Sequence, residues 1–124
     1  MTDKQWERLT WFSADEKDHN GNPAFPKPEK MSFVLMKKLD RARALAQVTF
    51  TINSSWREND KKTHGSGEAV DIRCVSSGKR HKMLNAFTAV GFVRRGIYDK
   101  HIHVDIGKAS DGHAQNVLWW GKSK

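Results

Sequence analysis

Two short segments that combine imidazoles with carboxylates place the strongest constraint on this fold: residues 63–71 (THGSGEAVD) and residues 101–105 (HIHVD). The first segment holds a histidine and an aspartate seven residues apart, and the second holds two histidines at i and i+2. Side chains alternate across a strand, so His101 and His103 point to the same face if the second segment is extended. A fold that brings the two segments together can therefore place three ligands around one metal ion.

The residue types fit a catalytic zinc site. Such sites typically take three protein ligands from His nitrogen and carboxylate oxygen, and they leave a fourth position to water or substrate. His64, Asp71 and His103 supply that set. Asp71 lies in the apolar run AVDI, where a bare charge is costly to bury without a cation nearby. His101 would then stand beside the ion, placed to transfer a proton.

Both segments resemble the signatures of one family. THGSGEAVD is similar to the SxHxxGxAxD signature of the zinc D-alanyl-D-alanine carboxypeptidases, a family that also holds the L-alanyl-D-glutamate peptidases of phage endolysins. HIHVD, followed by Gly107, resembles the closing HxHxD segment of the same family. Residues 52–57 (INSSWR) resemble its SGYR segment, although Ser55 stands where Gly is usual and Thr63 replaces the usual Ser. The resemblance runs from about residue 11 to residue 120.

The resemblance implies a hedgehog/DD-peptidase-like fold that holds one Zn²⁺ ion through the three ligands named above. It maps Arg57 onto an arginine that binds substrate or stabilises the transition state. Many members place an acid three residues before the last zinc histidine, but this chain has Lys100 there. The expected proton-transfer group is therefore His101, with Asp99 in reserve. Asp105 is expected either to orient an imidazole or to cap a turn.

The implied function is that of a phage or prophage endolysin, an L-alanyl-D-glutamate endopeptidase that cleaves peptidoglycan stem peptides and lyses the host. Within the same family, a D-alanyl-D-alanine carboxypeptidase is the alternative. A zinc-containing module that binds the cell wall without catalysis is the alternative from another class, because the hedgehog domain keeps such a site without peptidase work. The presence of His101 and Arg57 favours an enzyme.

The chain has a formal net charge of +8, and its cations are spread along the sequence. Such a charge favours a polyanionic partner, here expected to be the anionic polymers of a bacterial envelope. Nucleic acid is not expected, because the sequence has no finger spacing, RNP-like segment or recognition-helix signature. The N-terminus lacks the apolar core of a signal peptide, and no run approaches the roughly 18 apolar residues of a membrane span. We expect a monomer that is made in the host cytoplasm and acts on the wall after release.

The length of 124 residues predicts one domain, residues 1–124, of α+β class, with two main helices packed on a small antiparallel sheet. Residues 1–27 are expected to form an arm that packs on the core through Trp6, Trp11, Phe12 and Phe25. Apolar spacing predicts helices over residues 28–46 and 77–90. Strands are predicted at residues 47–52, 68–74, 92–97 and 101–106. The tryptophans of residues 117–120 (VLWW) are expected to close the core or line the groove, and Cys74 is expected to be buried.

Overall fold

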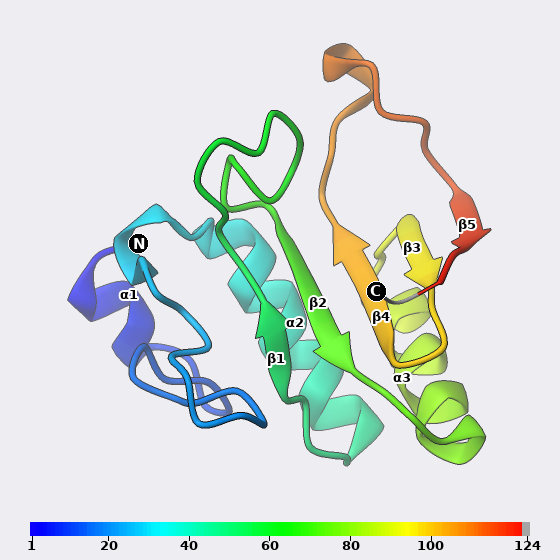
Figure 1. Ribbon diagram of the computed structural model, residues 1–124, viewed down its shortest axis with the longest axis horizontal. Helices are drawn as coiled ribbons and strands as arrows, with labels where there is room; N and C mark the ends of the chain where they lie inside the picture. The colour runs from blue at the N-terminus through cyan, green and yellow to red at the C-terminus, as the bar shows by residue number, and fades with distance from the viewer. Residues whose placement is uncertain (123–124) are drawn as a thin grey trace.

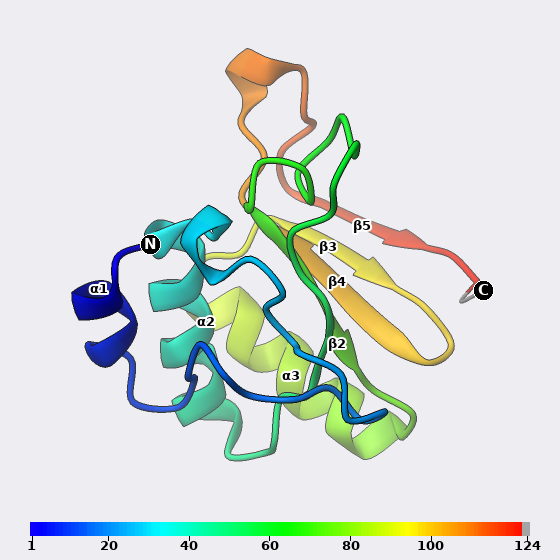
Figure 2. The ribbon, with the colours of Figure 1, turned by 60° about the vertical axis from the view of Figure 1, so that its left-hand side comes forward.

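The computed structural model describes residues 1–122, in which helices pack against one face of a mixed sheet (Figures 1 and 2). The helices are α1 (Asp3–Glu7), α2 (Phe33–Ala46) and α3 (Ser77–Ala89). The strands are β1 (Ile52–Ser54), β2 (Ala69–Arg73), β3 (Arg94–Ile97), β4 (His101–Asp105) and β5 (Val117–Trp120). Two short 3-10 helices lie at Pro28–Lys30 and Ala109–Asp111. The α+β class predicted from the sequence is confirmed. No helix among residues 1–122 is long and apolar enough to cross a membrane.

The strand order is β1-β2-β4-β3-β5, and β2 and β4 form its antiparallel centre. The prediction of a fully antiparallel sheet is wrong for β5, which pairs with β3 in parallel. In the register of the sheet, Arg94 of β3 lies opposite both Asp105, where β4 ends, and Val117, where β5 begins. The chain therefore leaves β4 and enters β5 at the same end of the sheet. A strand that starts there beside β3 runs in the same direction as β3.

The two long helices begin and end at residues suited to those positions. Ser32 caps α2 by accepting a hydrogen bond from the backbone N–H of Leu35, and Ser76 does the same for Lys79 in α3. After α3 the chain reverses at Gly91, whose φ of 87° is the left-handed conformation that glycine adopts readily. These caps make α2 start at residue 33, so the predicted start at residue 28 is wrong.

The first predicted strand, residues 47–52, is also wrong. Gln47 takes a left-handed conformation (φ 55°) and caps the end of α2, so the chain cannot continue into a strand at that residue. The observed strand β1 begins at Ile52 and ends at Ser54. Phe50, in the connection, is buried against Phe87 of α3 at a ring-centroid distance of 5.6 Å. The apolar alternation that suggested a strand therefore reflects burial of this connection in the core.

The N-terminal residues pack on the α2 side of the core and beside β1 (Figure 1). Trp6 and Phe25 meet edge to face at 4.8 Å, and the indole N–H of Trp6 donates to the Pro28 carbonyl at 3.2 Å. Phe12 is buried as well, whereas Trp11 is 50% exposed, so the expectation that Trp11 packs down is wrong.

The central strands separate apolar from polar side chains. The core residues Val70, Ile72, Ile102 and Val104 are fully buried and lie in one cluster with the apolar residues of α2 and α3. Side chains alternate along a strand, so the residues between them point to the opposite face. That second face carries the polar side chains Asp71, His101, His103 and Asp105. The hydrophobic core thus fixes the backbone under the candidate site.

Candidate metal centre

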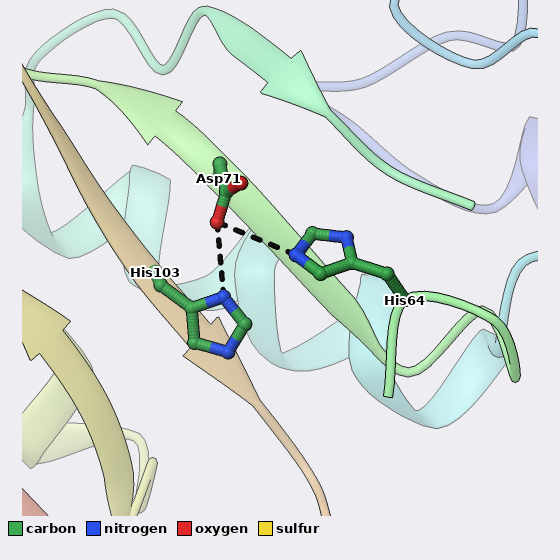
Figure 3. A group of neighbouring side chains, drawn as sticks. All are labelled: His64, Asp71 and His103. Carbon is green, nitrogen blue, oxygen red and sulfur yellow. Dashed lines mark hydrogen bonds and ion pairs between the residues drawn. The ribbon is translucent and has the colours of Figure 1, made fainter. Parts of the chain in front are cut away.

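Three elements bring the predicted ligands together. Asp71 comes from β2 and His103 from β4, and the antiparallel register places them opposite one another. His64 comes from the loop between β1 and β2, which folds back over the sheet (Figure 3). Gly67 allows this return: its φ is 71°, and a Cβ atom there would lie 1.9 Å from the Lys30 carbonyl oxygen. Only glycine fits such a close approach of two backbones.

The ligand atoms converge on one carboxylate oxygen. Asp71 Oδ1 lies 2.9 Å from His103 Nδ1 and 3.4 Å from His64 Nε2 (Figure 3). One ligand atom from each residue lies within 4.8 Å of the other two, which makes the group able to hold a metal ion. Asp71 and His64 are buried, and His103 is half-buried. The arrangement is the one predicted from the two sequence segments.

The remaining ring nitrogens have partners that orient both imidazoles. His64 Nδ1 lies 2.7 Å from the carbonyl oxygen of Ser55, which can only accept, so Nδ1 donates. His103 Nε2 lies 2.7 Å from Asp105 Oδ2, and donates to that carboxylate. Lone pairs are then available at His64 Nε2 and His103 Nδ1, the two atoms nearest Asp71 Oδ1. This is how protein scaffolds fix the ring orientation of ligating histidines.

Asp105 has the positions of both its expected roles: Oδ2 faces His103 Nε2, and Oδ1 caps the following turn at Gly107. Its buried carboxylate also accepts hydrogen bonds from Arg94 Nε at 2.6 Å and from the Gly107 backbone N–H at 2.8 Å. Burial alone would raise the pKa of Asp105. The hydrogen bonds from His103, Arg94 and Gly107 outweigh burial and lower that pKa to about 2. The group is therefore ionised at neutral pH.

Burial and hydrogen bonding also oppose one another at the predicted metal ligands Asp71 and His103. Burial opposes the charge of Asp71, but its contacts with His103 and His64 hold its pKa well below the usual range. Burial likewise opposes a charged His103, yet its bonds to Asp105 and Asp71 raise the pKa of that ring. A second proton on His103 would let Nδ1 and Nε2 donate to the two carboxylates. A divalent cation that binds these ligands would displace that proton, so its binding would depend on pH.

Arg57 reaches the centre from the loop that follows β1. Its Nη2 lies 2.6 Å from Asp71 Oδ2 and 3.2 Å from His64 Nε2, and its Nε donates to Ser54 Oγ at 2.8 Å. The guanidinium therefore uses one oxygen of Asp71, whereas the two imidazoles face the other. An ion at Oδ1 could share the carboxylate with Arg57 if the guanidinium withdrew from His64 Nε2.

His101 lies beside the three ligands without joining them. Its Nε2 is 4.0 Å from Asp71 Oδ1, and its ring stacks on Tyr98 at 4.3 Å with the planes 11° apart. Burial is the main cause that lowers the pKa of His101, which favours the neutral ring at neutral pH. The reserve candidate, Asp99, is exposed in the turn between β3 and β4 and does not line the cavity described below. Of the two candidates, only His101 faces the ligands.

The site opens into a cavity of about 1010 Å³. Its walls include residues that sequence reasoning left out or set aside, namely Arg94, Tyr98 and His113. Trp119 of β5 also lines it, 5.5 Å from the His103 ring, which confirms one of the two places expected for this tryptophan. No local motif in the sequence marks His113 as a residue of the site. Its position follows from the return of the chain towards β5.

We compared the chain with protein-family models, with curated proteins and with solved structures, and none of the three comparisons gives a match.

Proposed function

We propose that this protein is a zinc-dependent peptidase that cleaves the stem peptides of peptidoglycan, as a phage or prophage endolysin of the L-alanyl-D-glutamate endopeptidase type. One observation carries the proposal: His64 Nε2, His103 Nδ1 and Asp71 Oδ1 converge at the wall of an open cavity. The bond specificity and the phage setting rest on the resemblance of the two sequence segments alone. In this proposal the monomer is made in the host cytoplasm and acts on the wall after release.

The donor set fits zinc. Two imidazole nitrogens and one carboxylate oxygen are ligands of catalytic zinc, and both imidazoles are oriented by second hydrogen bonds. A zinc ion there would polarise the scissile carbonyl and lower the pKa of its bound water towards about 7. The open side of the cavity leaves room for that water and for a substrate.

The residues around the ligands have distinct roles in this mechanism. His101, largely neutral at neutral pH, accepts a proton from the attacking water and returns it to the leaving amine. Arg57 is 46% exposed on the cavity side, so its guanidinium can turn to a substrate carboxylate or to the developing oxyanion. Tyr98 holds the His101 ring by stacking. Asp105 keeps His103 in the orientation that aims Nδ1 at the ion.

A chelation experiment tests the metal and the activity together. Zinc content is measured for the wild type and for His103→Ala, and both are tested for clearing of purified peptidoglycan with and without chelator. We expect about one zinc per wild-type chain, with clearing that is lost in chelator and restored by added zinc. His103→Ala should bind zinc weakly and clear nothing. His81→Ala is the matched control, because His81 is an exposed histidine of α3 far from the cavity.

The products decide which bond is cut. Mass spectrometry of defined muropeptides should show new amino termini at D-glutamate, whereas loss of a terminal D-alanine would assign a carboxypeptidase. A folded, zinc-loaded protein that releases no product would leave the non-catalytic wall-binding module. A wild-type protein that takes up no zinc would refute the metal centre itself.

A further inference from the structure

Two aromatic side chains in the cavity wall, Tyr98 and Trp119, contact one another beside the candidate metal centre. The indole N–H of Trp119 donates to the Tyr98 hydroxyl oxygen at 3.2 Å. Trp119 belongs to β5, and Tyr98 directly follows β3 (Figure 1). We call these two side chains the aromatic pair.

Two glycines make room for the aromatic pair. A Cβ atom at Gly96 would lie 2.5 Å from the Trp119 indole nitrogen, and a Cβ atom at Gly121 would overlap the Tyr98 ring. Gly121 is held beside β3 by its backbone N–H, which donates to the Ile97 carbonyl at 2.9 Å. Both rings therefore lie directly on backbone that carries no side chain, so the sheet fixes their positions.

The register of the sheet brings the aromatic pair to the predicted ligands. His103 lies opposite Gly96, and Gly96 lies opposite Trp119. The indole lies over Gly96 and comes within 5.5 Å of the His103 ring, measured between ring centroids. The Tyr98 ring stacks on His101 at 4.3 Å. The Tyr98 hydroxyl is thus held between a ring that stacks on His101 and an indole that contacts His103.

The bond from Trp119 determines how the Tyr98 hydroxyl can act. An indole N–H can only donate, so the hydroxyl oxygen accepts this bond and keeps its own proton. Among residues 1–122, that proton has no acceptor. Tyr98 is half-buried in the cavity wall, so its O–H group can donate to a group that enters the cavity.

We propose that the Tyr98 hydroxyl is a further catalytic group, which donates a hydrogen bond to the carbonyl oxygen of the peptide bond that is cleaved. This inference rests on the proposed function. When water adds to the carbonyl carbon, an electron pair of the C=O bond moves to that oxygen, and a donor already in place stabilises the new charge. Tyr98 keeps its own proton throughout, and the proton from the water passes through His101 to the leaving amine. Trp119 is a positioning residue, because its N–H orients the hydroxyl.

The first test measures product release from defined muropeptides by zinc-loaded protein. Tyr98→Phe keeps the ring that stacks on His101 and removes only the hydroxyl. The matched control is Ser110→Ala, which removes a hydroxyl from an exposed residue outside the cavity wall. We expect Tyr98→Phe to lose about 10²–10³-fold in kcat with little change in KM, which is the typical effect of removing one oxyanion donor. The control should match the wild type.

A second measurement avoids turnover. A phosphinate analogue of the stem peptide carries a negative oxygen where the oxyanion would form, whereas the product peptides do not. Tyr98→Phe should bind the phosphinate about 10–100-fold more weakly, as expected for a lost hydrogen bond to a charged group, and should bind the products as the wild type does. The zinc dissociation constant should not change, which would exclude an indirect effect through His103. Thermal unfolding shows whether each variant retains the wild-type fold.

Trp119 separates contact with the substrate from a purely structural role of the hydroxyl. Trp119→Phe removes the N–H that orients the hydroxyl and leaves Tyr98 intact. If the hydroxyl only held the indole in place, Tyr98→Phe/Trp119→Phe would be no slower than Trp119→Phe alone. We expect the double variant to be slower in kcat by a further factor of about ten or more, because the hydroxyl itself bonds to the reacting oxygen.

The outcomes distinguish this inference from the proposed function. Activity of Tyr98→Phe equal to that of the wild type would refute the role of Tyr98 and leave the peptidase in place. A loss confined to KM would also refute it, as would equal losses of affinity for the phosphinate and for the products. A zinc-loaded wild type that releases no product would refute the peptidase, and the catalytic role of Tyr98 with it.

Discussion

Asp105 provides the sharpest test of how the metal centre is built, because it touches no predicted metal position and acts through His103. The substitution Asp105→Asn keeps the shape of the side chain but replaces one acceptor oxygen by an NH₂ group. Arg94 and the Gly107 N–H both need the remaining oxygen, so the NH₂ group faces His103 Nε2. That nitrogen must then accept, which moves the ring proton to Nδ1 and removes the lone pair intended for the ion.

The structure sets the size of the loss in zinc affinity and of the loss in folding stability. Removal of a hydrogen-bonded partner that orients a metal ligand typically weakens metal binding by 10–100-fold, and we expect a loss in this range. The depressed pKa of Asp105, about 2 against an ordinary 3.8, corresponds to about 2 kcal/mol of stability at neutral pH. A domain with about 5–15 kcal/mol of stability tolerates that loss. The variant should therefore fold and bind zinc weakly.

Competition with a chromophoric chelator measures the zinc dissociation constant, and denaturant unfolding of the metal-free protein measures stability separately. Asp111→Asn is the control, since it removes the same charge from an exposed residue of the short helix at Ala109–Asp111. The control should change zinc affinity less than threefold. A folded Asp105→Asn protein with the wild-type dissociation constant would refute the role of Asp105 in orienting His103.

Three further predictions concern stability. Asp71 and Asp105 have depressed pKa values in the folded protein, so their contribution to the free energy of unfolding is complete above their ordinary pKa near 4 and is lost as pH falls towards 2. Denaturant unfolding of chelated protein should show this decline, and a free energy of unfolding that does not change with pH would contradict it. Gly96→Ala places a Cβ atom 2.5 Å from the Trp119 indole nitrogen, so we expect a loss of about 1–3 kcal/mol in thermal unfolding, and an unchanged melting temperature would show that the indole moves freely. Phe50→Ala empties a fully buried ring position and should cost about 3–5 kcal/mol of stability in urea unfolding, with an unchanged m-value. A cost below about 1 kcal/mol would contradict the packing described.

Sequence reasoning succeeded where local pattern decides the structure. The i, i+2 spacing of His101 and His103 determines their shared face once β4 is a strand, and the apolar run around Asp71 determines β2. It failed where the conformation depends on distant packing. Gln47 ends α2 in a left-handed conformation that its residue type does not signal, and this displaced the first strand.

The cavity walls were hard to predict for a related reason. Trp119 reaches His103 only because β5 pairs in parallel with β3, and Tyr98 reaches His101 only because the ring stacks across the turn. Both contacts depend on the paths of the connections between strands, and the apolar periodicity of the sequence does not encode those paths. His113 is brought to the cavity by the same segment between β4 and β5.

The charges of the candidate centre favour an anionic ligand. Along the open face, Arg94, Asp105, His103, Asp71 and Arg57 alternate in sign and are joined by hydrogen bonds of 2.6–2.9 Å. With His103 protonated, these five groups sum to one positive charge. Replacement of that proton by a divalent cation would raise the sum to two. A hydroxide and a substrate carboxylate at the open side would restore the balance, so binding of the ion and binding of an anionic peptide should reinforce one another.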